Sequence, residues 1–267
     1  MDLRSTFGLH TTPFTRELRI EDQLTMPMHQ EALEGLLRAL DGRMSAALIA
    51  PAGTGKTALL RRLVDRLPEA RYQVRSVKVT GLSKRDLCRE IAAACGVSPA
   101  GSYPALVRKL TERFETTLDD GGLRPVLVLD EAHELRPEVL SMLRLLTNFK
   151  MDSRLVLSIV LSGQPPLATL LRRDDQEAIA RRLVYYATLR TFSDAETHAY
   201  VEHRCAIAGA ARSLFDAAAV DALYEMSRGN LRAIDSLALE ALGIAARAKA
   251  TVVCAGHLVA ARKVLWP

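Results

Sequence analysis

The chain has 267 residues, of which 49% are hydrophobic and 25% are charged, and its formal net charge at pH 7 is +5. This composition suits one large or two smaller globular domains and excludes a fibrous or disordered chain. No apolar run approaches the roughly 18 residues that a membrane-spanning helix needs, and the N-terminal sequence has no apolar signal region, so we expect a cytoplasmic protein with no membrane partner. The modest positive charge does not by itself identify DNA as a partner.

Residues 7–14, FGLHTTPF, place two phenylalanines and a proline ahead of the first long helical pattern, at residues 28–40. In a nucleotide-binding protein such a segment could lie against the base. A hydrophobic clasp that holds the N-terminus on the core accounts for the same pattern, and one segment can do both. Both interpretations stay open at this point.

The stretch LIAPAGTGKT, residues 48–57, is the strongest motif of the chain. An apolar run predicts a strand, a Gly-rich turn follows, and a helical pattern then begins at Lys56. Gly53 and Gly55 let backbone N–H groups point into a concavity at a helix start, which is a favourable place for phosphate. We therefore predict a phosphate-binding loop made of Pro51, Ala52, Gly53, Thr54, Gly55, Lys56, Thr57 and Ala58.

The side chains of this loop have separate expected roles. Lys56 is expected to reach the β- and γ-phosphates of ATP, and the Thr57 hydroxyl is expected to ligate the Mg²⁺ that bridges them. Ala50 stands where the motif usually has its first glycine. This change is tolerable because the end of the strand needs a small residue more than it needs a positive φ.

Strand and helix patterns alternate after the loop. Residues 74–79 have the composition of a strand, and helical patterns follow at residues 83–95 and 103–118. A continuous apolar run at residues 126–129 fits a strand that is buried on both faces. The alternation predicts a parallel sheet with helices on its faces.

The buried run ends in adjacent acids, Asp130 and Glu131, within the sequence PVLVLDEAHEL. Two carboxylates at the tip of a central strand are costly without a partner, and Mg²⁺ with its waters supplies one. Asp130 is predicted to hold that ion through water, and Glu131 to orient and activate the attacking water. Surface acids that cap the next helix are the alternative, but the position about 75 residues after the phosphate loop favours catalysis.

A further apolar strand is predicted at residues 155–161, and polar residues follow it. Gln164 or Ser162 is a candidate to hydrogen-bond the γ-phosphate or the attacking water, although a simple turn accounts for them nearly as well. Upstream of this strand, Lys150 and Arg154 lie on a loop or helix end, where solvated surface charge is the default interpretation.

Two arginines, Arg181 and Arg182, precede the last predicted strand at residues 184–189. An arginine in this place suits an arginine finger, which contacts the nucleotide bound to a neighbouring subunit. Such a residue can increase the rate of hydrolysis by about 10³ to 10⁵. Ordinary arginines on a helix surface fit the spacing as well.

From residue 191 onward the pattern is only helical. Ser193 and Glu196 form a predicted capping box, and further helices are expected at residues 231–248 and 255–265. We predict a nucleotide-binding α/β domain over residues 1–190, with the clasp at 1–27, and a helical lid over residues 191–267. Arg232, at a helix start, could reach back to the phosphates or could be a capping or surface arginine.

The cysteines show neither paired spacing nor a zinc-ligand pattern with histidine, so they are expected to be reduced and mostly buried. They are Cys88, Cys95, Cys205 and Cys254.

Together these motifs resemble the AAA+ superfamily: the loop APAGTGKT, the acidic box LVLDEAHEL, the strand tip LSGQPPL, the arginines of AIARRL, and GNLR in the lid. More narrowly, FGLHTTPF, DEAHEL, LTNFKMDS, LSGQPPL and ARRL resemble the ExeA-like ATPases, the family of the ATPase domain of general secretion pathway protein A. The resemblance covers nearly the whole chain. It implies a five-stranded parallel sheet, a small all-helical lid, and Mg-dependent ATP hydrolysis at the subunit interfaces of a homo-oligomeric ring or helical filament.

The resemblance also implies a role for single residues. Phosphate and magnesium binding fall on Lys56 and Thr57, and magnesium binding and hydrolysis on Asp130 and Glu131. The sensor and finger positions fall on Gln164 or Ser162 (first sensor), Arg182 or Arg181 (finger) and Arg232 (second sensor). Two departures are Ala50 for the usual glycine and GNLR for the commoner G-x-P-R, and the second one bears on the Arg232 assignment.

Secretion members of this family carry a transmembrane segment and a periplasmic portion, and we expect neither here. The chain is then similar to the TniB, IstB and phage Mu B transposition regulators, which bind double-stranded DNA with ATP and direct a transposase to its target site. In those relatives basic residues after the second strand and on neighbouring loops line the DNA path. The matching residues here are Lys78, Lys84 and Arg85, with Lys150 and Arg154 as weaker additions.

The first functional hypothesis is therefore an ATP-dependent, sequence-nonspecific DNA-binding ATPase that regulates transposition through nucleotide-controlled oligomerisation. The alternative is an ExeA-type ATPase of a secretion or membrane-assembly system that does not bind DNA. A slow NTP-binding signalling switch fits the same active site.

Overall fold

The computed structural model describes residues 3–149 and 153–266. The chain divides into two compact units. The helical unit consists of Met1–Met26, Gly53–Ala58 and Arg190–Pro267, and the sheet unit of Pro27–Ala52 and Leu59–Leu189. Every helix within the described ranges is too short or too polar to cross a membrane.

The sheet unit is built on five parallel strands in the order β2-β3-β4-β1-β5. The predicted α/β class with a five-stranded parallel sheet is confirmed. Because β1 and β3 both pair with β4, the three strands end at one edge of the sheet. The strands are β1 (Ser45–Ile49), β2 (Tyr72–Lys78), β3 (Arg124–Asp130), β4 (Ser158–Gly163) and β5 (Leu183–Thr188).

Alternate side chains of the strands form two apolar cores, one on each face of the sheet. On β3, Leu127 and Leu129 belong to one core, whereas Val126 and Val128 belong to the other. The period of two follows from the pleat of a strand, and burial on both faces gives the continuous apolar run that predicted it.

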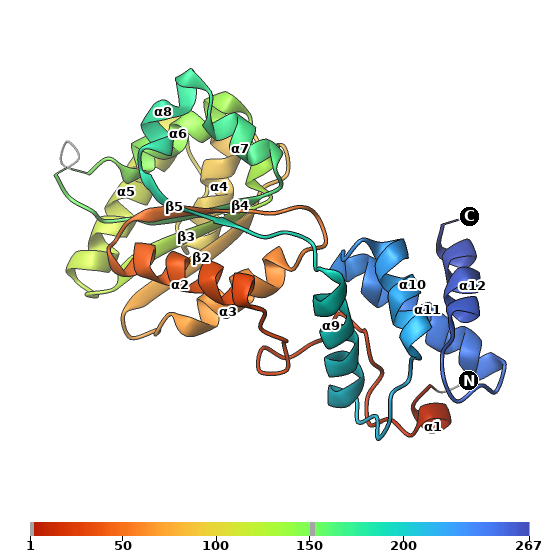
Figure 1. The fold of residues 1–267 in the computed structure, drawn as a ribbon. Coiled ribbons are helices and arrows are strands. Elements are labelled where there is room, and N and C mark those ends of the chain that lie inside the picture. The colour runs from red at the N-terminus through yellow and green to blue at the C-terminus, as the bar shows by residue number, and fades with distance from the viewer. Residues whose placement is uncertain (1–2, 150–152, 267) are drawn as a thin grey trace. The chain divides into compact units, whose positions relative to one another are not determined.

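Helices cover both faces of this sheet (Figure 1). The face with Val126 packs against α2 (Pro27–Asp41) and α3 (Lys56–Arg66). The face with Leu127 packs against α4 (Lys84–Ala94), α5 (Tyr103–Asp119) and α6 (Pro137–Thr147). Short helical segments precede β5, namely α7 (Pro166–Leu171), η2 (Asp174–Gln176) and α8 (Glu177–Ala180).

The helical unit contains α1 (Leu3–Phe7), α9 (Asp194–Ile207), α10 (Ala217–Ser227), α11 (Leu231–Arg247) and α12 (Ala255–Leu265). Three of these helices, α9, α10 and α11, begin at capping side chains. Ser193 accepts a hydrogen bond from the Glu196 N–H, Asp216 from the Ala219 N–H and Asn230 from the Ala233 N–H. Gly229, with φ of +70°, follows the end of α10.

The segment 3–26 packs within the helical unit. Phe14 is 2% exposed and its ring meets that of Phe215 edge-on at 5.8 Å. Arg204, itself buried, donates to the Thr15 carbonyl at 2.7 Å and lies 5.6 Å from the Phe14 ring centroid. The clasp thus lies on the C-terminal helices, whereas the predicted division placed it with the α/β domain. Sequence spacing gave no sign of this because Arg204 and Phe215 are about 190 residues away from the segment.

The bounds of two further elements differ from the sequence-based predictions. Residues 137–147 form α6, a region for which the sequence predicted only a loop or helix end near Arg154, and β4 lies at 158–163 in place of the predicted 155–161. Among the described cysteines, three are buried and Cys254 is exposed, and all are free thiols. Burial raises the pKa of Cys88 to about 11 and that of Cys205 to about 12, so both stay protonated at neutral pH.

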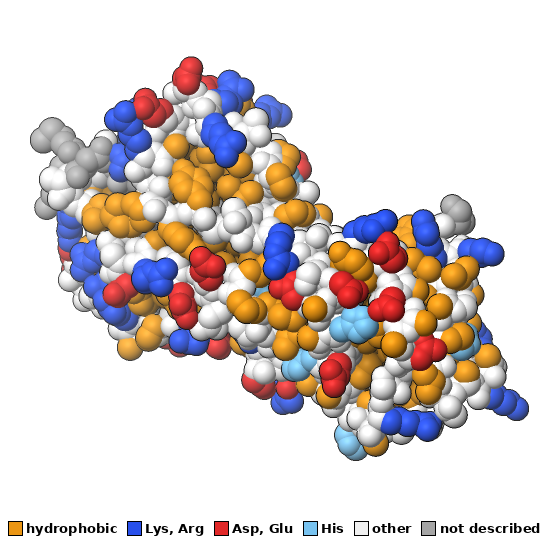
Figure 2. Space-filling view, viewed as in Figure 1, with side chains coloured by type: hydrophobic (Ala, Val, Ile, Leu, Met, Phe, Trp, Pro, Cys, Tyr) orange, Lys and Arg blue, Asp and Glu red, His pale blue; other side chains and the backbone are white. Residues whose placement is uncertain are grey.

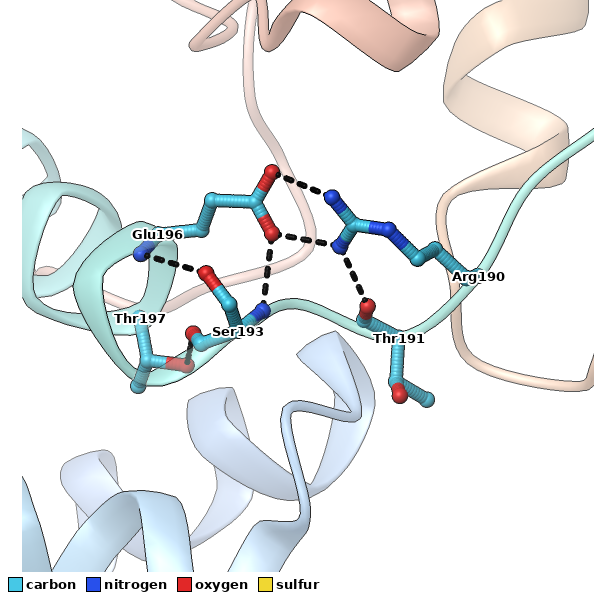
Figure 3. A network of polar contacts seen from close by, with 5 residues as sticks. All are labelled: Arg190, Thr191, Ser193, Glu196 and Thr197. Atoms are coloured by element: carbon cyan, nitrogen blue, oxygen red, sulfur yellow. Dashed lines mark hydrogen bonds and ion pairs between the residues drawn. The ribbon is translucent and has the colours of Figure 1, made fainter.

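A polar network forms where the helical unit begins after β5 (Figure 3). Both terminal nitrogens of the Arg190 guanidinium group, Nη1 and Nη2, donate to the Glu196 carboxylate at 2.6 and 2.9 Å, and the Ser193 N–H donates to the same carboxylate at 2.7 Å. Because these donors favour its charged form, chiefly through Arg190, the pKa of Glu196 falls from 4.5 to about 2.

This pKa predicts how stability depends on pH. A carboxyl group whose pKa is lowered by folding contributes stability above its unfolded pKa and loses the contribution as pH falls towards its folded pKa. Glu196→Gln should therefore cost about 1–2 kcal/mol of unfolding free energy at pH 7. The difference from wild type should shrink between pH 4.5 and about 2, as measured by urea unfolding. Glu202→Gln, an exposed change on the same helix, is the control and should cost less than about 0.5 kcal/mol; a constant Glu196→Gln deficit across this range would contradict the prediction.

Candidate active site

The phosphate loop leaves β1 at the edge where β4 ends. Ile49 is paired with Gly163, and the Ala50 N–H donates to the Gly163 carbonyl at 3.0 Å. Ala50 is 1% exposed, so a small residue fits the place where the motif usually has glycine. The start of the phosphate loop, directly after β1, is therefore held in place by its hydrogen bond to β4.

The loop has the backbone that a phosphate cradle needs. Gly53 and Gly55 have φ of +75° and +96°, in the left-handed region that favours glycine. Lys56 and Thr54 are buried, at 7% and 1% exposure, whereas Thr57 is exposed in the first turn of α3. These residues fit a triphosphate with Mg²⁺, because backbone N–H groups, a lysine and a hydroxyl meet at a helix start.

Gly53 is closely approached by the start of α11, within the helical unit. A Cβ added at Gly53 would lie 2.3 Å from Asn230 Oδ1, and the Arg232 N–H donates to the Gly53 carbonyl at 3.3 Å. The structure therefore brings the predicted Arg232 to the loop through its backbone, with its side chain exposed. Asn230 was not predicted as part of the site, and its only sequence signal was its place before a helix.

The acids lie at the tip of β3, in the sheet unit. Asp130 is half-buried, and its Oδ1 accepts hydrogen bonds from Ser162 Oγ at 2.9 Å and from the Glu131 N–H at 3.0 Å. Ser162 is fully buried. Glu131 has φ of 58° and ψ of 33°, a left-handed conformation that is uncommon for a residue with a side chain. Such outliers cluster at functional sites.

His133 joins Glu131 to Gln164. Its side chain is 9% exposed and lies in η1 (Ala132–Glu134), which directly follows Glu131. His133 Nδ1 lies 3.5 Å from Glu131 Oε2 and accepts from the Gln164 N–H at 3.3 Å, and His133 Nε2 lies 2.9 Å from Gln164 Nε2. The sequence reasoning gave His133 no role, although it stands three residues after Asp130 in the acidic box.

The two arginines proposed as fingers differ in their surroundings. Arg181 is 77% exposed at its side chain and pairs with Glu177 at 2.6 Å. Arg182 is half-buried and donates from Nη1 to the Thr147 carbonyl at 3.4 Å. The choice between them stays a prediction.

The basic residues proposed for DNA fall into two groups. Lys78, at the end of β2, and Lys84 and Arg85, in the first turn of α4, are exposed, and Arg85 donates to the Gly101 carbonyl at 3.2 Å. Arg154 instead donates both guanidinium amino groups to the Asp119 carboxylate. Lys150 lies outside the described residues.

Residues 38–171 match a family model described as an AAA domain. The chain is also 32% identical over 242 residues to general secretion pathway protein A of Aeromonas hydrophila, and the match covers 88% of this chain and 43% of that protein. The chain thus spans less than half the length of this relative.

Solved structures share the fold at low identity. The Aeropyrum pernix ORC1 protein in complex with DNA matches with a TM-score of 0.69 and 21% identity, covering 94% of this chain and 68% of that one. Cdc6p from Pyrobaculum aerophilum matches with a TM-score of 0.75 and 19% identity, covering 99% and 71%. These likenesses establish the architecture.

The contact between Gly53 and Asn230 predicts an unusual cost for a small substitution. Gly53→Ala and Gly81→Ala both place a side chain at positive φ, which costs about 1–2 kcal/mol, but nothing lies within 4 Å of a Cβ at Gly81. Gly53→Ala should therefore lower the melting temperature more than Gly81→Ala. Adding Asn230→Gly should recover only the excess, and equal melting temperatures for the two alanine variants would refute the contact.

Proposed function

Since this chain belongs to the AAA+ ATPases and its ATPase domain is ExeA-like, we propose that it binds ATP with Mg²⁺ at the phosphate loop and hydrolyses it with Glu131. The observation that carries the proposal is the arrangement at the tip of β3. Asp130 is held by Ser162 of the neighbouring strand, and Glu131 follows it in a left-handed turn. This strand and β1, which leads into the loop, end at the same edge of the sheet.

The loop residues bind the triphosphate in this proposal. Lys56, with the backbone N–H groups around Gly53 and Gly55, neutralises charge on the phosphates. Thr57 and Asp130 hold the magnesium ion. When bound, Mg²⁺ bridges the phosphate oxygens and stabilises the charge that develops on them.

Glu131 orients the attacking water and accepts its proton. Gln164, or Ser162 beneath it, hydrogen-bonds the γ-phosphate or that water. Ser162 is fully buried and its hydroxyl donates to Asp130, whereas Gln164 is partly exposed at the strand tip, which favours Gln164 for this role.

Arginines complete the proposed site in a homo-oligomer. Arg182, or the more exposed Arg181, reaches the nucleotide of the adjoining subunit, and Arg232 acts from the start of α11. ATP would then join subunits in a ring or filament, and hydrolysis would weaken the interface because the γ-phosphate contact is lost.

The chemistry is tested by Glu131→Gln. The amide keeps the size of the side chain but cannot take a proton, so turnover should fall by about 10² or more while ATP affinity stays within a few fold of wild type. Steady-state phosphate release and fluorescent-nucleotide binding measure the two quantities. Glu138→Gln, exposed in the first turn of α6, is the matched control and should turn over ATP nearly normally. Normal turnover in Glu131→Gln would remove this residue from the chemistry.

We further propose that the chain binds duplex DNA with ATP and regulates transposition by recruiting a transposase to its target. Support comes from the exposed basic side chains Lys78, Lys84 and Arg85 on one short segment, and from a net charge of +5. Two structures with the same fold were solved with DNA, the Aeropyrum pernix ORC1 protein and Drosophila ORC. Contacts of lysine and arginine side chains with the phosphate backbone do not distinguish one DNA sequence from another.

A second candidate is a secretion or membrane-assembly ATPase without DNA binding. The 32% identity to general secretion pathway protein A favours it. A neighbouring gene for a DDE-type transposase would support the first function, and a neighbouring gene for secretin assembly the second.

DNA binding is tested with charge reversal. Wild type with ATP should bind random duplex DNA with an affinity that falls steeply as salt rises, because each neutralised phosphate releases counterions. Lys84→Glu with Arg85→Glu should weaken binding at least about 10-fold and flatten the dependence on salt. Arg262→Glu with Lys263→Glu, exposed on α12, changes the net charge equally and is the control. Equal DNA affinity of the two double variants would reject the proposed DNA path.

A further inference from the structure

We infer that His133 is a positioning residue that makes the orientation of Glu131 depend on Gln164. The inference rests on the proposed function, in which Glu131 activates water and Gln164 contacts the γ-phosphate or that water. His133 does not touch the reacting atoms in this account. Instead, a change in the position of the Gln164 side chain changes the orientation of the Glu131 side chain through His133.

The geometry places one imidazole between both groups. His133 Nδ1 lies 3.5 Å from Glu131 Oε2 and 3.3 Å from the Gln164 backbone nitrogen. His133 Nε2 lies 2.9 Å from Gln164 Nε2 and 3.4 Å from Glu134 Oε1. At 9% exposure the ring has little access to water, so these groups supply its hydrogen-bond partners.

A neutral imidazole carries one proton, and the two nitrogens therefore play opposite parts. With the proton on Nε2, the lone pair of Nδ1 accepts the Gln164 N–H and cannot donate to Glu131. With the proton on Nδ1, the ring donates to the Glu131 carboxylate, and Nε2 accepts from the Gln164 side-chain amide. His133 can satisfy Glu131 or the Gln164 backbone through Nδ1, but not both.

The groups at Nε2 select between these states: the Glu134 carboxylate at 3.4 Å favours a proton on Nε2, and the side-chain amide of Gln164 can add to or oppose that preference. Its NH₂ facing Nε2 favours the state in which His133 donates to Glu131, and its carbonyl facing Nε2 favours the other. When Gln164 turns its amide towards a γ-phosphate or a water, the contact with Nε2 changes and the proton distribution of the ring changes with it. Glu131 is then held by His133 or released for the attacking water.

The backbone around His133 is tight enough to transmit such a change. A Cβ added at Gly163, the residue before Gln164, would lie 3.0 Å from the His133 backbone nitrogen. Glu131 stands two residues from His133 and is fixed in a left-handed conformation. Because little free space separates β4 from η1, a shift at the tip of β4 reaches the turn that carries Glu131.

The first test reads the ring itself. Nitrogen NMR of ¹⁵N-histidine-labelled protein, with His133 assigned by its loss in His133→Asn, reports which ring nitrogen carries the proton. Gln164→Ala and Glu131→Gln should each change the protonated fractions of Nδ1 and Nε2. Gln30→Ala, exposed on α2 of the same unit and paired with Glu34, is the control and should change neither. Identical His133 signals in wild type and Gln164→Ala would overturn the inference.

The second test separates positioning from structure. His133→Ala should lower kcat for ATP about 10-fold or more and change KM less than threefold, while His133→Asn, which keeps an amide near the place of Nδ1, should recover part of kcat. Combining His133→Ala with Gln164→Ala should cost no more than the larger single change, because both break one link.

The outcomes distinguish the inference from the proposed function. Slow turnover in Glu131→Gln together with normal kcat in His133→Ala, or additive effects of His133→Ala and Gln164→Ala, would overturn the inference alone. Normal turnover in Glu131→Gln would overturn the catalytic assignment and the inference with it. Melting temperatures of the variants within a few degrees of wild type confirm that a loss of kcat is not a loss of fold.

Discussion

The hydrogen bond from the buried Ser162 hydroxyl to the Asp130 carboxylate ties together the two strands that carry the catalytic candidates. A carboxylate at the end of an apolar strand costs free energy unless it is hydrogen-bonded, and here a side chain and a backbone N–H both donate to Oδ1. The position of Asp130 in turn sets the direction of the chain at Glu131, where the backbone turns left-handed. The Glu131 N–H donates to Asp130 Oδ1, and the Glu131 carbonyl accepts from the Glu134 N–H at 2.9 Å, so hydrogen bonds on both sides hold the left-handed turn at the tip of β3.

The sheet explains why polar chemistry gathers at this edge. Both faces of the central strands are covered by helices and filled by apolar side chains, so the ends of the strands are the places where charged groups can meet solvent or a ligand. Parallel strands bring these ends to one side, and ligands of open parallel sheets bind outside them. β1, β3 and β4 are neighbours in the sheet although about 80 residues separate β1 from β3 in the chain. The order of the strands, more than any single contact, brings the start of the phosphate loop and the acids Asp130 and Glu131 to one edge of the sheet.

Features that depend on local sequence could be predicted, and those that depend on distant contacts could not. The phosphate loop, β3 and the cap at Ser193 each have a signature within a few residues. The packing of Phe14 against Phe215 and the approach of Asn230 to Gly53 have none, because the partners are far apart in the chain. The link between His133 and Gln164 depends on the turn after Glu131, which no pattern in the sequence specifies.

The active site does not determine the partner, because the residues that would bind ATP lie in the loop and at the strand tips, whereas a partner meets the surface. A basic side chain indicates a binding site for a polyanion only where no neighbouring acid already neutralises its charge. The Arg154 guanidinium is paired with the Asp119 carboxylate, so that pair adds little net field for a phosphate backbone. Lys78, Lys84 and Arg85 are exposed within eight residues of one another. The acids beside them are Asp86, next to Arg85, and Asp130, the register partner of Lys78 on β3. Electrostatic attraction to a polyanion grows with the number of uncompensated charges that it meets together. If duplex DNA is the partner, the segment from the end of β2 to the first turn of α4 is therefore where the binding free energy concentrates.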